Sequence, residues 1–231
     1  MGQGEKATRN AGQFALEFPF EPSFAREEFL TAPCNADALA MIDRWPSWPD
    51  RLLLLVGPPG SGKSHLAAIW ARRATALVAL PEAPPPLEAL ARLKPEAVLV
   101  DGIEDARDET ALFHLLNYAN ENNIHVLLTG RLRPHEDRVR LPDLLSRMRR
   151  APLLEIGAPD EELIHAVLEK LFRDRQLVVE PGLADYLTLR LERSLDAARA
   201  FVRDLDREAL MRGRRVTRVL AGELLDRART D

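Results

Sequence analysis

Short, continuous runs of apolar residues recur through the first two thirds of the chain, separated by polar or turn-forming residues. Runs of this length without polar alternation predict strands that are buried on both faces, as in a parallel sheet. The clearest run is LLLLV, which ends at a glycine. The expected strands span 52–56, 76–80, 97–101, 124–130 and 152–156.

Amphipathic stretches lie between these runs, with apolar residues at helical spacing. The helices expected between the strands span 63–74, 87–93, 109–120 and 141–148. A short helix is expected before the first strand, at 35–44, and either Asn35 or Asp37 would cap it. Because strands and helices alternate, the sequence predicts an α/β fold with right-handed crossovers around a parallel, five-stranded sheet.

The strand signal stops after Pro159, and the rest of the chain shows only helical periodicity. Asp160, Ser194 and Thr217 are of the residue types that begin helices. The helices expected in this part span 160–175, 181–191, 194–211 and 217–228. The chain is therefore expected to comprise an N-terminal tail (1–24), an α/β domain (25–158) and an all-helical domain (159–231).

Composition and charge limit the classes of protein that fit this sequence. The 231 residues carry a net charge of -4, so a large basic surface for DNA is not expected. The single cysteine, Cys34, excludes an intrachain disulfide and suits a reducing compartment. We find no apolar run of about 18 residues and no secretory signal, so we expect a cytoplasmic protein without a membrane partner.

The segment GPPGSGKS matches the phosphate-loop pattern G-x-x-x-x-G-K-[ST] in full. It follows an expected strand and precedes an expected helix, which is the context that this motif requires. Glycines let backbone N–H groups converge on a phosphate, and the start of the helix adds a partial positive charge. The residues expected to bind the phosphate chain are Gly57, Pro58, Pro59, Gly60, Ser61, Gly62, Lys63 and Ser64.

An acidic residue, Asp101, ends the apolar run at 97–100. In a protein with a phosphate loop, an acid at this place is the Walker B residue, which holds Mg²⁺ together with the loop hydroxyl, here Ser64. The alternative is a surface aspartate at a strand end. We therefore expect Mg²⁺ as the metal and ADP or ATP as the nucleotide.

Several segments together resemble the DnaA/Hda family of AAA+ ATPases, which comprises the bacterial replication initiator DnaA and its short regulatory relative Hda. They are FLTAPCNADAL (29–39), GPPGSGKSHLA (57–67), VLVDGIED (98–105), VLLTGRLRP (126–134), LPDLLSRM (141–148) and DLDREAL (204–210). The resemblance implies an AAA+ P-loop NTPase fold with a helical lid. It also implies that the DNA-binding domain of DnaA is missing, so no sequence-specific DNA binding is expected.

The resemblance assigns further roles to individual residues. Phe29, Leu30 and Asn35 lie where the family brackets the adenine, and His65 adjoins the loop. Thr129 lies at the end of the sensor I strand.

Arg147, in LLSRM, falls at the arginine finger, which reaches the nucleotide of a neighbouring molecule. The alternative is a solvated arginine beside Arg149 and Arg150. Because AAA+ modules usually associate side by side, the resemblance also implies homo-oligomers as well as contact with DnaA.

The N-terminal segment QFALEF resembles the short motif by which replication proteins dock on the sliding clamp, the β subunit of the DNA polymerase. Gln13 would bind a polar notch, while Phe14, Leu16 and Phe18 would fill an apolar pocket. The alternative is a strand that packs on the domain itself.

Three positions depart from an active AAA+ ATPase. Gly102 follows Asp101 where many relatives carry a second acid, and Arg131 stands where the initiator has an acid after sensor I. The lid arginine, called sensor II, is replaced by Asp196. These departures predict a protein that binds nucleotide but hydrolyses it slowly.

Nearby residues offer substitutes for two of these losses. Glu104 and Asp105 lie close to Gly102 in sequence, and Arg193 and Arg199 flank Asp196 by one helical turn.

The preferred hypothesis is an Hda-like regulator of replication initiation, which binds the clamp and stimulates hydrolysis of DnaA-bound ATP in trans. The alternative is an independent AAA+ ATPase or helicase-loader-like protein that acts on DNA. A small-molecule kinase is a third hypothesis, but the helical tail and the clamp-like segment have no role in it.

Overall fold

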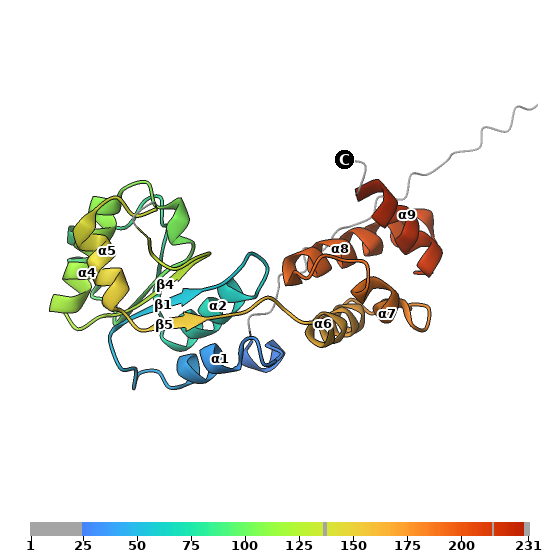
Figure 1. Cartoon of the computed structure of the whole chain (residues 1–231), viewed down its shortest axis with the longest axis horizontal. Helices are drawn as coiled ribbons and strands as arrows, with labels where there is room; N and C mark the ends of the chain where they lie inside the picture. The colour runs from blue at the N-terminus through green and yellow to red at the C-terminus, as the bar shows by residue number, and fades with distance from the viewer. Residues whose placement is uncertain (1–24, 136–137, 214, 229–231) are drawn as a thin grey trace, which may run out of the picture.

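A five-stranded parallel sheet forms the centre of the first domain in the computed structural model, which describes residues 25–135, 138–213 and 215–228 (Figure 1). The strands lie in the order β2-β3-β4-β1-β5, and every pair is parallel. Their bounds are β1 Leu52–Val56, β2 Leu77–Ala79, β3 Ala97–Val100, β4 His125–Gly130 and β5 Leu153–Glu155. The sequence predicted all five, with ends that differ by no more than one or two residues.

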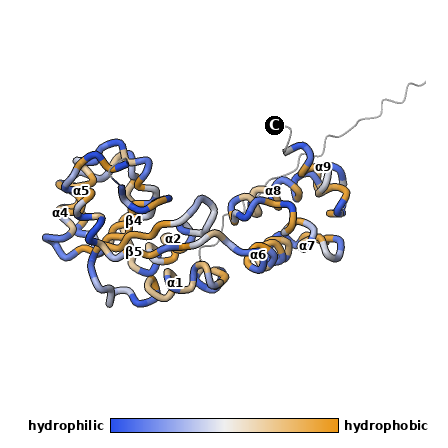
Figure 2. The backbone as a smooth tube through the Cα atoms, viewed as in Figure 1, coloured by the Kyte–Doolittle hydropathy of each residue, from blue (hydrophilic) through white to orange (hydrophobic). Residues whose placement is uncertain are grey.

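Helices cover both faces of the sheet because successive strand residues point to opposite faces. Leu53 and Leu55 of β1 pack in one core with α1 and α2, whereas Leu54 and Val56 pack in a second core with α3, α4 and α5. The bounds are α1 Ala36–Asp43, α2 Lys63–Arg73, α3 Leu87–Leu93, α4 Glu109–Glu121 and α5 Pro142–Arg150. Figure 2 shows the hydrophobic residues gathered along the strands.

The C-terminal part is helical and has a hydrophobic core of its own. The bounds are α6 Glu161–Asp174, α7 Leu183–Thr188, α8 Leu195–Arg212 and α9 Arg218–Ala228. The expected caps of three helices form: Asp160 accepts from Leu163 N, Ser194 from Ala197 N and Thr217 from Leu220 N. None of the helices within the described ranges is long and apolar enough to cross a membrane.

The cap expected for α1 does not form. Asn35 stands at the right place, but its side chain makes no hydrogen bond to the helix. Its Oδ1 instead accepts from Ala32 N at 2.9 Å, and its Nδ2 donates to Leu30 O at 3.0 Å. Asn35 is 2% exposed, so it fixes the loop before α1 from the inside.

Candidate nucleotide-binding site

The loop at 57–62 joins β1 to α2, and three of its glycines are required by the backbone. Gly60 and Gly62 have φ angles of 67° and 98°, in the left-handed region that favours glycine. A Cβ atom on Gly57 would clash with the carbonyl oxygen of Ile156. Leu66 N donates to Gly62 O at 3.0 Å at the start of α2, and the N-terminus of a helix carries a partial positive charge that attracts an anion.

Two side chains of the loop suit a phosphate chain. Lys63 Nζ donates to the carbonyl oxygens of Gly57 and Pro58, at 2.8 Å each, which holds the ammonium group over the loop. Burial lowers the pKa of Lys63, while the negative charges of Glu104 and Asp101 oppose this effect. The Ser61 hydroxyl is buried and has no hydrogen-bond partner among the described residues. An anion in the loop would give this hydroxyl an acceptor.

Asp101 and Thr129 meet at the ends of the neighbouring strands β3 and β4. Thr129 Oγ1 donates to Asp101 Oδ1 and accepts from Gly102 N at 2.8 Å. Thr129 therefore orients the Asp101 carboxylate, and Thr129 is itself buried. The hydroxyl of Ser64, in the first turn of α2, and the carboxylate of Asp101 are the hard oxygen ligands that would hold Mg²⁺.

The residues expected to bracket the adenine line a narrow cavity of about 70 Å³ between the α/β domain and the lid. Phe29, Leu30, Asn35 and His65 all border it, together with Gly62 of the loop. The Phe29 and His65 rings meet edge to face, with centroids 5.3 Å apart. The structure thus brings the expected base-binding residues together with the phosphate loop.

Arg199 of α8 borders the same cavity and marks the contact between lid and loop. Its Nη2 lies 3.1 Å from His65 Nδ1, whereas Arg193 pairs with Glu161 at an exposed site. Of the two arginines considered as substitutes for sensor II, only Arg199 therefore faces the site. Burial and the charge of Arg199 lower the pKa of His65 to about 4, so this histidine is neutral at neutral pH.

The start of α8 rests directly on the phosphate loop. Leu195 N donates to Gly60 O at 2.8 Å, and a Cβ atom on Gly60 would clash with Ser194 Oγ. The N-terminus of α8 and the phosphate loop are therefore in direct contact.

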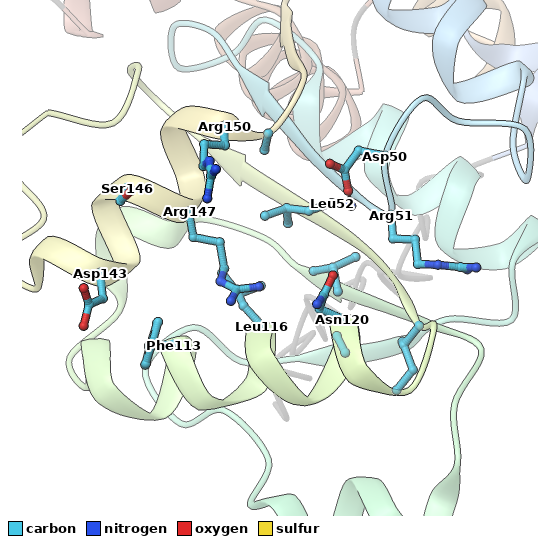
Figure 3. A pocket seen from close by; sticks show the side chains of 14 residues that line it. Asp50, Arg51, Leu52, Phe113, Leu116, Asn120, Asp143, Ser146, Arg147 and Arg150 are labelled. Carbon is cyan, nitrogen blue, oxygen red and sulfur yellow. Dashed lines mark hydrogen bonds between the residues drawn. The ribbon is translucent and has the colours of Figure 1, made fainter.

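Arg147 lies away from this site. It projects from α5 into a cavity of about 480 Å³ between α4 and α5, as Figure 3 shows. The cavity lies at the strand ends opposite the loop, next to Leu52 and Val126. The Arg147 guanidinium stands over the Phe113 ring at 5.9 Å. Within the described residues no acceptor binds Arg147, so its charge is available to another molecule.

One pair near the loop was not anticipated from the sequence. Glu104 and Arg131 are 27 residues apart, and they form an ion pair beside Lys63. The expected clamp-binding residues Gln13, Phe14, Leu16 and Phe18 lie outside the described residues.

Comparisons by sequence find no matching family model and no matching curated protein. Comparison of structures finds many matches. Domain III of the replication initiation protein DnaA from Thermotoga maritima has a TM-score of 0.73 at 17% identity, over 90% of this chain and 97% of that chain.

Two other solved structures are also similar to this chain. AMPPCP-bound DnaA from Aquifex aeolicus has a TM-score of 0.64 at 16% identity, over 80% of this chain and 65% of that chain. The RuvB Holliday junction branch migration motor from Thermotoga maritima has a TM-score of 0.65 at 16% identity, over 88% of this chain and 72% of that chain. The chain thus has the AAA+ P-loop NTPase fold, with a parallel five-stranded sheet followed by a helical region.

Proposed function

We propose that this protein is an Hda-like regulator of replication initiation, which binds adenine nucleotide and stimulates hydrolysis of DnaA-bound ATP in trans. Nucleotide binding is supported by the loop at 57–64, where buried Ser61 and the glycines form a cradle for phosphates. The similar DnaA structure from Aquifex aeolicus binds AMPPCP. Mg²⁺ would be held by Ser64 and Asp101 and would neutralise part of the phosphate charge.

The position of Arg147 is the observation that carries the trans activity. This arginine lies at the opposite end of the strands from its own phosphate loop, and among the described residues it contacts the Phe113 ring but has no hydrogen-bond acceptor. A guanidinium that has no hydrogen-bond acceptor can stabilise charge on the γ-phosphate of a nucleotide held by a neighbouring molecule. Such a finger is worth ~10³–10⁵ in rate in other nucleotide hydrolases.

The sliding clamp is the second proposed partner, through Gln13, Phe14, Leu16 and Phe18. Its support is the resemblance of QFALEF to clamp-docking peptides. Binding to the clamp would bring Arg147 to the place where DNA is copied.

A hydrolysis assay in trans tests this proposal. DnaA loaded with radiolabelled ATP would be mixed with clamp on DNA and with wild-type protein, Arg147→Ala or Arg149→Ala. Arg149 is the matched control because it is exposed on the same turn of α5 and does not border the cavity. We expect stimulation by the wild type and by Arg149→Ala, and loss with Arg147→Ala. Equal stimulation by all three would exclude Arg147 as the finger.

Clamp binding has its own test. Wild-type protein and the Gln13→Ala, Phe18→Ala double variant would be titrated onto immobilised clamp. We expect affinity of about 1 μM or tighter for the wild type only, which corresponds to roughly 8 kcal/mol. Absence of binding by the wild type would remove the clamp from the proposal and leave the nucleotide site.

The alternative is an independent AAA+ ATPase or helicase-loader-like protein that acts on DNA. The observation in its favour is Glu104, a carboxylate close to Lys63 that the sequence alone did not place. Rapid ATP hydrolysis by the isolated wild-type protein would favour this alternative over the regulator.

A further inference from the structure

An ion pair between Glu104 and Arg131 occupies the space beside the phosphate loop. Glu104 lies in the 3-10 turn η2 (Ile103–Asp105) after β3, and Arg131 directly follows β4. Arg131 Nε is 2.8 Å from Glu104 Oε1, and the backbone N–H of Arg131 donates to Glu104 Oε2 at 3.3 Å. Arg131 thus holds both oxygens of this carboxylate.

Backbone contacts place the pair at the nucleotide site. Gly130 O accepts from Gly57 N at 3.2 Å, which joins the end of β4 to the first residue of the phosphate loop. A Cβ atom on Gly130 would lie 3.7 Å from Glu104 Oε2. The Glu104 carboxylate therefore lies next to Gly130, whose carbonyl oxygen is hydrogen-bonded to the first residue of the loop. Burial lowers the pKa of Lys63, and among the negative charges that oppose this shift the charge of Glu104 has a larger effect than that of Asp101.

The turn after β3 explains why Glu104 reaches this place. Gly102 has a φ of 86°, in the left-handed region, and its N–H donates to Thr129 Oγ1. The chain therefore reverses immediately after Asp101 and returns the side chain of Glu104 towards β4. Gly102 stands where many relatives carry a second acid after Asp101. The turn at Gly102 brings Glu104, two residues later, close to the same site.

We propose that Glu104 is the carboxylate of this chain that can activate water for ATP hydrolysis, and that Arg131 holds it in an inactive arrangement. In the reaction the water oxygen attacks the γ-phosphorus, and Glu104 accepts a proton from that water. The bond between the γ-phosphorus and the β–γ bridging oxygen breaks, which yields ADP and phosphate. While both carboxylate oxygens are bound to Arg131, Glu104 cannot turn towards the water.

This inference rests on the proposed nucleotide site and is independent of the proposed clamp and DnaA partners. It gives a physical reason for weak intrinsic hydrolysis that is different from the absence of a base. The base is present, and an arginine of the same chain binds it.

Single-turnover hydrolysis of ATP by the full-length chain tests the inference with four variants. Arg131→Met removes the guanidinium and keeps an unbranched apolar side chain, Glu104→Gln removes the base, and the double variant removes both. Arg133→Met is the matched control, because Arg133 is two residues away and forms an exposed ion pair with Glu155 at 2.7 Å. Melting temperatures would verify that every variant is folded.

We expect Arg131→Met to raise the hydrolysis rate at least about tenfold, within the ~10²–10⁴ that a positioned base can contribute. The double variant should not show this increase, and Arg133→Met should remain at the wild-type rate. If Arg131→Met shows no increase, or if the increase survives the loss of Glu104, the inference is overturned.

Nucleotide affinity supplies a second readout that does not depend on turnover. Arg131→Met removes the positive charge that balances Glu104 beside the expected place of the terminal phosphate, so the ratio of AMPPCP to ADP affinity should fall about tenfold, whereas Glu104→Gln should raise it. An unchanged ratio in both variants would place the pair away from the terminal phosphate and refute the inference alone. Failure of the wild type to bind either nucleotide would refute the proposed site and this inference with it.

Discussion

Acidification should destabilise this protein through His65, a buried histidine of α2. The residue is 8% exposed, and burial together with the charge of Arg199 lowers its pKa to about 4. Lys170 acts in the same direction, and Glu28 opposes it. In the unfolded chain the pKa is about 6.5. Between these two values the unfolded chain binds more protons than the folded one, so stability rises with pH in this range and is lost as pH falls.

The magnitude follows from these two pKa values. At pH 8 both states carry neutral His65, and the residue contributes no penalty. At pH 5 the unfolded histidine is mostly protonated while the folded one remains mostly neutral, which lowers the free energy of unfolding by about 2 kcal/mol. A loss of this size is a large fraction of the total stability of a typical domain, ~5–15 kcal/mol.

Urea denaturation at pH 5, 6, 7 and 8 measures this effect, with tryptophan fluorescence as the signal. All three tryptophans lie in the α/β domain that contains His65, so the signal reports on the relevant unfolding step. His65→Gln is the comparison, because it keeps a polar side chain that cannot be protonated in this range. We expect the wild type to lose about 2 kcal/mol more than the variant between pH 8 and pH 5. Parallel pH profiles of the two proteins would refute the reasoning.

Three further substitutions test other parts of the site. Lys63→Ala should weaken ADP binding about 10- to 100-fold in calorimetric titration, because a charge-assisted hydrogen bond to phosphate is lost. Gly60→Ala should lower the melting temperature more than Gly213→Ala does: both glycines have left-handed φ angles, but only at Gly60 would the new Cβ meet Ser194. Asn35→Ala should lower the free energy of unfolding by about 2 kcal/mol in urea denaturation, because it leaves Ala32 N and Leu30 O without their partner. An unchanged affinity, equal melting temperatures or an unchanged midpoint would contradict the respective expectation.

The sequence predicted the elements well where the signal is local. The run at 52–56 became β1, and the expected helix at 87–93 became α3 with the same ends. The phosphate loop was also predictable, because all of its residues are contiguous and its glycines are required by the backbone of the loop itself. The cap at Asn35 was predicted wrongly, since the amide found partners inside the preceding loop.

Residues that are distant in sequence were beyond this kind of prediction. From the sequence, Arg193 and Arg199 were equally good substitutes for sensor II, since each is one helical turn from Asp196. Only the packing of α8 on the loop places Arg199 beside His65, whereas Arg193 pairs with Glu161. The pairing of Glu104 with Arg131 likewise required β3 and β4 to be neighbours in the sheet.

The sequence by itself therefore determined the strands, the helices and the phosphate loop, because periodicity, glycine spacing and proline positions act over a few residues. The tertiary structure decided the strand order, which of Arg193 and Arg199 lies beside His65, the placement of Arg147 at the far end of the strands and the pairing of Glu104 with Arg131. These features depend on which apolar faces pack together, and a side chain acquires its partner only after that packing has brought separate segments within hydrogen-bonding distance.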